Sequence, residues 1–83
     1  MERNLELERL QHLLTVIGLL DSAVREIELA IEILHEESDL YYENNDNRRG
    51  NICYDAKGIL ALDLTRLKER RDYLVRVLAT KDN

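Results

Sequence analysis

Apolar residues in the first half of this 83-residue chain recur at alternating spacings of three and four. The residues that follow this spacing are Leu10, Leu13, Ile17, Leu20, Val24, Ile27, Ile31 and Leu34. A repeat that averages about 3.5 residues keeps one apolar seam facing a partner helix over its whole length. The sequence therefore predicts an all-α protein of the coiled-coil or bundle type, and these eight residues are its predicted oligomer interface.

Composition also favours long helices. The chain has no proline, three glycines and neither phenylalanine nor tryptophan, which is unlike a sheet protein with frequent turns. Residues 43–51 are rich in Asn, Asp and Gly, which compete with helical hydrogen bonding. We expect a single helical domain over 1–83, with Asn51 or Asp55 capping the second helix. Its predicted segments are a helix at about 4–42, a loop at 43–51, a helix at about 52–79 and a polar tail at 80–83.

One point in the first helix is open to a different interpretation. Gly18 weakens a helix by about 1 kcal/mol relative to alanine, and Ser22 could cap a new one. A break near these residues would give three helices. Because the spacing of the seam crosses this point without a slip, we expect one continuous helix within a long helical hairpin.

The predicted second helix has a less regular seam, in which Arg71 fills an otherwise apolar series. The apolar members are Leu60, Leu64, Leu67, Leu74 and Leu78. We expect Arg71 to extend its charged end to water or to pair with an acid of another helix, such as Glu28 or Glu32.

The two predicted helices carry more apolar surface than one hairpin can cover. The longer first helix would overhang the second by roughly ten residues at about 1.5 Å per residue. Apolar residues in the overhang are Leu5, Leu7, Leu10, Leu13 and Leu14, and Leu19, Leu29 and Ile33 lie off the seam. The prediction is a homo-oligomer, most simply a dimer with a four-helix core, although a different partner protein would solve the same problem.

Charge is unevenly divided along the chain, whose net charge is −5. Residues 1–47 hold twelve acids and three bases, whereas residues 48–83 hold five acids and nine bases, so the two parts carry −9 and +4. An acidic helix lying antiparallel to a basic one explains this pattern. An acidic protein is a poor candidate for binding nucleic acid.

The basic second helix also permits a ligand-binding interpretation. Arg66, Arg70 and Tyr73 share one helical face. Arginine binds phosphate bidentately, and tyrosine can stack on a base. An oligomer that binds a nucleotide or another phosphate-containing ligand is therefore the alternative function.

Two acidic motifs suggest metal chemistry without establishing it. Glu32 and His35 have the Glu-x-x-His spacing of di-iron bundles, but the second helix has no histidine. Glu69 and Asp72 resemble the second acidic pair of the all-α nucleotide pyrophosphohydrolases. That resemblance implies a magnesium-dependent enzyme, with Glu36 and Asp39 as the first pair. It is the lesser alternative, because a spacing of three between acids arises readily in so acidic a chain.

No catalytic, cofactor or metal-binding residues are assigned from the sequence, and no enzyme activity is expected. The single thiol, Cys53, suits a reducing compartment, and we find neither a signal peptide nor an apolar run long enough for a membrane span. The predicted function is a cytoplasmic, non-enzymatic interaction module acting through oligomerisation. An adaptor, a small regulator, a chaperone-like subunit or an inhibitor would all fit.

Overall fold

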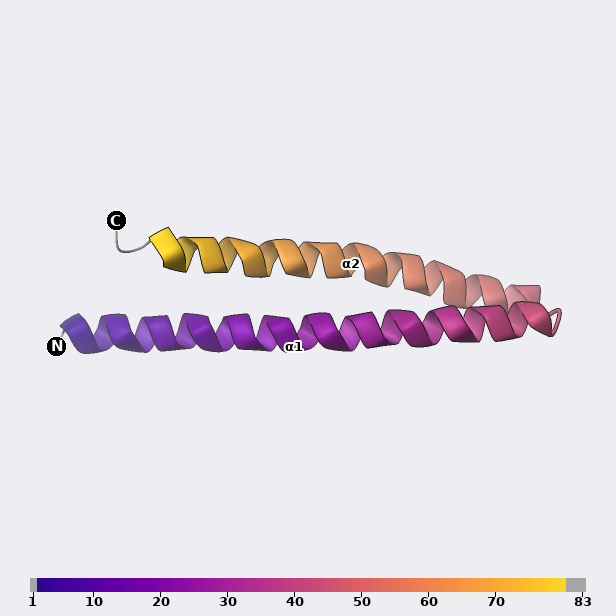
Figure 1. Cartoon of the computed structure of the whole chain (residues 1–83), viewed down its shortest axis with the longest axis horizontal. Helices are drawn as coiled ribbons and strands as arrows, with labels where there is room; N and C mark the ends of the chain where they lie inside the picture. Colours follow the sequence, from indigo (N-terminus) through magenta and orange to yellow (C-terminus); the bar gives the residue numbers. More distant parts are fainter. Residues whose placement is uncertain (1, 81–83) are drawn as a thin grey trace.

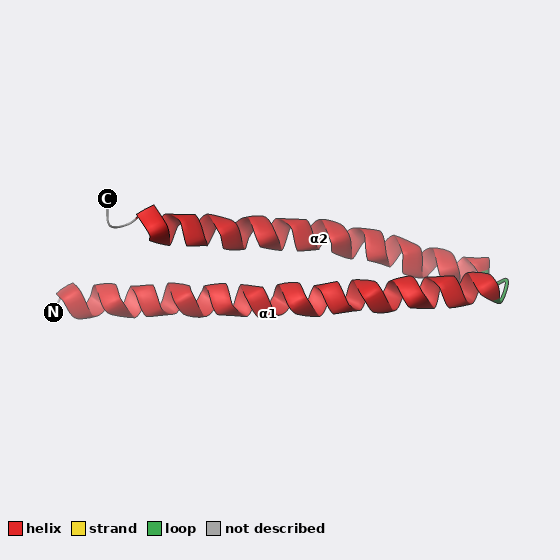
Figure 2. Cartoon of the chain, in the orientation of Figure 1, coloured by secondary structure: helices red, strands yellow, loops and turns green. Residues whose placement is uncertain are grey.

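The chain forms a hairpin of two long antiparallel helices (Figures 1 and 2). The computed structural model describes residues 2–80. Helix α1 spans Glu2–Glu43 and helix α2 spans Asn47–Thr80, and the molecule extends over 65 × 18 × 12 Å. The predicted all-α hairpin is confirmed. Residues 81–83 of the predicted polar tail lie outside the described residues.

Helix α1 is continuous through the point where a break was considered. Gly18 and Ser22 both lie inside α1, so the three-helix alternative is wrong. The unbroken seam explains this result, because one stripe of packed side chains along the whole helix offsets the local cost of a glycine.

The connection between the helices is shorter than predicted. It comprises residues 44–46, whereas the sequence predicted a loop over 43–51. Asn45 has a φ of 62°, its N–H donates to the Tyr42 carbonyl at 3.0 Å, and the Asp46 N–H donates to the Tyr41 carbonyl at 2.8 Å. These two bonds form a Schellman motif, in which asparagine takes the left-handed position after the helix end.

Asp46 ends this motif and also begins α2. Its Oδ1 accepts the backbone N–H of Arg49 at 3.2 Å, and its carbonyl accepts the first helical N–H, from Gly50, at 3.0 Å. Asp46 is therefore the N-cap of α2. The predicted caps, Asn51 and Asp55, are wrong, because both lie inside the helix.

The seam of α1 faces α2, which carries a matching seam of its own. The α2 seam also alternates spacings of three and four, through Gly50, Cys53, Lys57, Leu60, Leu64, Leu67, Arg71, Leu74 and Leu78. Its first three members were missed in the sequence because none is a large apolar residue. Three members of the α2 seam, Gly50, Lys57 and Arg71, make polar contacts with α1.

The helices approach closely near the loop. Ser38 is only 2% exposed, and its Oγ donates to the Gly50 carbonyl at 3.1 Å. A Cβ atom at Gly50 would lie 2.7 Å from the nearest ring atom of Tyr42. The glycine therefore lets the Tyr42 ring pack directly on the α2 backbone.

The hairpin does not enclose a core of its own. Among the side chains described, over residues 5–79, Val24 is the one buried large apolar residue, and sixteen others are exposed. The accessible surface is 6900 Å², compared with about 5,200 Å² for a compact monomer of this mass. A large apolar area is therefore left in contact with solvent.

Part of this area lies on the free end of α1. Helix α1 has 42 residues and α2 has 34, so the N-terminal end of α1 extends beyond α2 (Figure 1). Leu5 and Leu7 on this extension are more than half exposed. The predicted overhang is present.

Candidate functional site

Three contacts define one side of the hairpin and fix the register of its helices. Arg71 Nη1 lies 3.0 Å from Asp21 Oδ1, and Lys68 Nζ lies 3.8 Å from Glu28 Oε2. Lys57 Nζ lies 3.2 Å from His35 Nδ1. We call this the ion-paired side. Residues of α1 and α2 that lie at the same level have numbers that add to about 92, as for Asp21 with Arg71 and His35 with Lys57.

Arg71 pairs with a different acid from those predicted. Its partner is Asp21 rather than Glu28 or Glu32, because the register puts Asp21 at the level of Arg71 and leaves Glu28 to Lys68. The hydrogen bond that Arg71 donates to the Asp21 carboxylate raises the pKa of Arg71, and Asp72 adds a weaker interaction in the same direction. Arg71 is therefore a charged member of the seam that is neutralised by α1.

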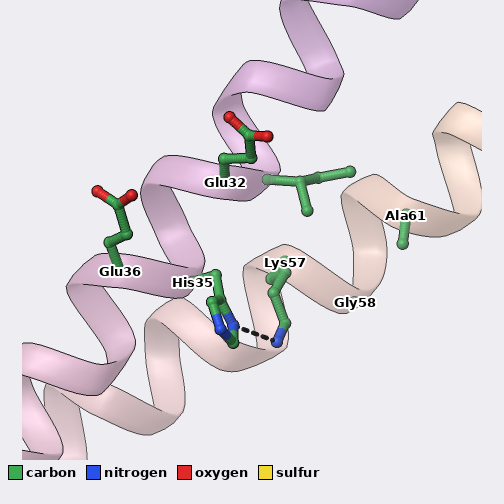
Figure 3. Close-up of a pocket in the computed structure, with 7 residues that line it drawn as sticks. Glu32, His35, Glu36, Lys57, Gly58 and Ala61 are labelled. Carbon is green, nitrogen blue, oxygen red and sulfur yellow. Dashed lines mark hydrogen bonds between the residues drawn. The ribbon is translucent and has the colours of Figure 1, made fainter.

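His35 lies between a cation and a carboxylate. Its Nδ1 faces Lys57, and its Nε2 lies 3.6 Å from Asp39 Oδ2. His35 and Lys57 border an open pocket of about 620 Å³ (Figure 3). Gly58 and Ala61 leave room between the helices, and Glu32 and Glu36 line the α1 side. Lys57 also lies over the ring of Tyr54, 4.5 Å from its centroid.

The Glu32 and His35 motif is not completed as a metal site. Within residues 2–80, no three His, Cys, Asp or Glu side chains are grouped so that they could hold a metal ion. Across the hairpin, His35 meets the Lys57 ammonium. A lysine cation beside the histidine opposes the binding of a second cation.

The four acids of the pyrophosphohydrolase-like motif do not meet within one chain. The register places Glu69 at about the level of residue 23 of α1, whereas Glu36 lies thirteen residues further along. At the helical rise, this separates the two acidic pairs by about 20 Å. The antiparallel register therefore contradicts a shared magnesium site in the single chain.

The opposite side of the hairpin is largely apolar. Its α1 residues follow a second alternation of three and four: Val16, Leu19, Ala23, Glu26, Ala30, Ile33, Glu37 and Leu40. Its α2 residues do the same: Ile52, Ala56, Ile59, Asp63, Arg66, Arg70, Tyr73 and Val77. We call these two rows together the apolar face.

Helix geometry places both rows on one side. On α1, residues 21, 28 and 35 flank the seam on one edge, and residues 16, 23 and 30 flank it on the other. On α2, Lys68 lies on the ion-paired side, and residues 56, 63, 70 and 77 flank the other edge of the seam. Because both helices turn one edge towards the ion-paired side, they turn their other edges towards the same opposite side.

The apolar face has features of a helix-packing surface. Eight of the sixteen exposed large apolar residues lie on it: Val16, Leu19, Ile33, Leu40, Ile52, Ile59, Tyr73 and Val77. Beside the line where α1 and α2 meet stand the small side chains of Ala23, Ala30 and Ala56. These three alanines leave room for another helix to approach at their levels, whereas the other inner positions hold Val16, Glu37, Asp63, Arg70 and Val77.

The predicted ligand-binding residues do lie together. Arg66, Arg70 and Tyr73 line one depression, but Glu69 lines it as well, and all four belong to α2. Within the described part of the chain, neither Arg66 nor Arg70 makes an ion pair. Ion pairs of Arg66 or Arg70 with Glu26, Glu32 or Glu36 of α1 are therefore not formed within the described hairpin.

The predicted oligomer interface lies along the intramolecular seam. The eight residues from Leu10 to Leu34 face the α2 side of the molecule, and all except Val24 keep part of their surface exposed. Their role in an oligomer stays a prediction. Sequence reasoning did not find the apolar face as a unit, although the recurrence of Val16, Ala23 and Ala30 every seven residues was a usable signal.

Comparisons with protein-family models, curated proteins and solved structures give no significant match to this chain. Between residues 2 and 80, neither helix has an apolar stretch of the length that crossing a bilayer requires. The functional argument therefore depends on the surface of the hairpin.

Proposed function

We propose that this chain is a non-enzymatic helical interaction module that acts by oligomerisation. The observation that carries the proposal is the apolar face, where large apolar side chains on both helices are exposed in two regular rows. Contiguous exposed apolar surface of this extent is typical of protein–protein contact sites.

The size of the hairpin supports the same proposal. A small domain has a thin stability margin, and this one has a single cysteine and thus no internal disulfide. Association with further helices would supply the missing core. Adaptors, small regulators, chaperone-like subunits and inhibitors are functions that such a module can serve. We assign it to the cytoplasm because its one thiol, Cys53, suits a reducing compartment.

Sedimentation velocity of the purified chain tests the proposal. We expect a species heavier than the 9.8 kDa monomer at micromolar concentration. A folded monomer that stays monomeric as the concentration rises would contradict it. A pull-down from the native host, run in parallel, would identify a different partner protein.

A second candidate function has its own observation. The side chains of Arg66, Arg70 and Tyr73 converge on one depression, and the two arginines are unpaired within the described residues. Arginine forks and an aromatic ring suit a nucleotide or another phosphate compound. Against this candidate, Glu69 in the same depression repels anions.

Thermal-shift screening with nucleotides and inorganic phosphate distinguishes the second candidate. Binding would raise the melting temperature of the native chain and would be lost in Arg66→Ala and Arg70→Ala. The matched control is Arg48→Ala, which removes a cation outside the depression. Equal shifts in all three variants would show binding elsewhere.

A further inference from the structure

We propose that the apolar face binds a second copy of this chain in one defined arrangement. The two hairpins stack face to face about a two-fold axis parallel to the helices, so that both loops lie at the same end. Each α1 then packs on α2 of the other copy. This inference rests on the proposed function and specifies its partner and geometry.

Symmetry leaves two ways to stack the hairpins. A two-fold axis in the plane of the contact runs either along the helices or across them. The first puts the loops together and each α1 over α2 of the second copy. The second puts the loops at opposite ends, so that α1 lies over α1 of the second copy and α2 lies over α2 of the second copy.

The charges of the two halves select the first arrangement. Residues 1–47, which include α1, carry −9, and residues 48–83, which include most of α2, carry +4. With the loops together, each acidic helix has a basic helix on both neighbouring sides. With the loops apart, α1 faces α1 and α2 faces α2, which sets like charge against like charge.

The outer positions of the apolar face are complementary in the same arrangement. With the loops together, α1 of one copy meets α2 of the other in the register of the hairpin itself, where numbers at one level add to about 92. This puts Leu19 level with Tyr73, Ile33 with Ile59, and Leu40 with Ile52.

The apolar face also carries five charged residues, and two of them form a matched pair in this arrangement. The same register puts Glu26 level with Arg66 of the second copy. Neither side chain has an ion-pair partner among the described residues of its own chain. With the loops at opposite ends, the two Glu26 side chains would meet near the middle of the bundle, and so would the two Arg66 side chains.

The available surface is sufficient for a stable dimer. The hairpin exposes 6900 Å², roughly 1,700 Å² more than a compact monomer of its mass. Each partner of a standard interface buries about 800 Å². The excess is about twice that area, so the extended hairpin has enough surface for an interface of standard size.

Charge reversal tests the predicted contact between Glu26 and Arg66. Because like charges then oppose each other twice per dimer, Glu26→Arg and Arg66→Glu should each raise the dimer Kd roughly tenfold or more. Mixing the two variants should restore wild-type affinity, since each chain then supplies the charge that the other needs. Glu36→Arg, off the apolar face, is the matched control and should leave the Kd within about threefold.

Distance measurement tests the arrangement of the loops. Spin labels go on Glu43→Cys, at the end of α1, in a chain that also carries Cys53→Ala. With the loops together, the labels lie within about 25 Å, because neighbouring helix axes are about 8–10 Å apart. With the loops apart, their separation approaches the 65 Å length of the hairpin. A label on Ser22→Cys, near mid-length, should give a short distance in either case and serves as the control.

The outcomes separate this inference from the proposed function. Short Glu43 distances with weakened reversal variants and recovery on mixing support the inference. Long distances, or reversal variants that dimerise as tightly as wild type, would overturn it and leave an oligomeric interaction module in place. A chain that stays monomeric would overturn both.

Discussion

Arg71 and Asp21 form a 3.0 Å ion pair across the hairpin, fifty residues apart in the chain. Arg71 occupies a seam position on α2, and its side chain is only 26% exposed. The pair therefore neutralises a cation at the helix–helix contact, in the same register as the other cross-helix contacts.

We predict a measurable coupling between these two residues. In a double-mutant cycle of Asp21→Ala and Arg71→Ala, monitored by urea unfolding, the coupling free energy should be favourable and clearly larger than that of a longer, more exposed pair. The matched control is Glu28 with Lys68, which is longer at 3.8 Å and more exposed. The control coupling should be about 0.3 kcal/mol. Equal couplings would contradict a special role for Arg71.

The raised pKa of Arg71 determines how the stabilising contribution of its ion pair depends on pH. A cation whose pKa is raised on folding contributes stability that is full below the unfolded pKa and lost only as the pH rises through the folded value. Both values are strongly alkaline for arginine. Titration of Arg71 should therefore leave the coupling unchanged from neutral to mildly alkaline pH, and a fall of the coupling between pH 7 and pH 9 would contradict this.

Alanine substitutions at the three glycines should have different effects on stability, depending on the space around each Cβ atom. A Cβ atom at Gly18 or Gly58 meets nothing within 4 Å, so Gly18→Ala and Gly58→Ala should each stabilise the protein by about 0.5–1 kcal/mol. At Gly50 the new Cβ overlaps the Tyr42 ring, so Gly50→Ala should give no gain or a loss. Denaturant midpoints at fixed protein concentration check this, and a clear gain at Gly50 would disprove the close contact.

The assignment of Asp46 as the α2 cap makes a further prediction. Asp46→Ala should destabilise the hairpin by about 1 kcal/mol because the Arg49 N–H loses its acceptor. Asp55→Ala is the control, since Asp55 is an exposed residue inside the helix. It should change stability by less than about 0.5 kcal/mol. A larger effect at Asp55 than at Asp46 would place the start of α2 nearer the sequence-based prediction.

Substitutions at two residues of similar exposure, one on the apolar face and one off it, test whether this face mediates self-association. Ile33 lies on the face and is 51% exposed, whereas Leu29 lies off it and is 57% exposed. Ile33→Gln should weaken self-association at least tenfold, because burying an unpaired polar group in the contact costs about 1–3 kcal/mol. Leu29→Gln should leave it unchanged. Sedimentation equilibrium measures both, and equal effects would show that the face is not the contact.

The course of α1 was predictable because one signal dominates it. Its seam is apolar at every position from Leu10 to Leu34, so periodicity alone gives its orientation and its continuity past Gly18. The start of α2 was not predictable in this way. Residues 47–51 have turn-like side chains but are helical, because the Schellman motif at Asn45 and the cap at Asp46 complete the connection in three residues.

Side-chain partners across the hairpin depended on a register that the sequence did not fix. The acid that pairs with Arg71 follows from the loop length, and the nine-residue loop that was predicted could not identify Asp21. The seam of α2 was obscured for a different reason. Gly50, Cys53 and Lys57 hold seam positions without being large apolar residues. The contacts of Ser38 with Gly50 and of His35 with Lys57 explain why two of them are accommodated.

The central claim is that the hairpin completes its core with a second set of helices. Thermal unfolding over a hundredfold range of protein concentration tests it most directly. For a folded oligomer, mass action raises the melting temperature as the concentration increases. The account predicts this rise, with loss of helical signal and dissociation in one transition. A melting temperature that is independent of concentration, with cooperative unfolding of a monomer, would contradict it.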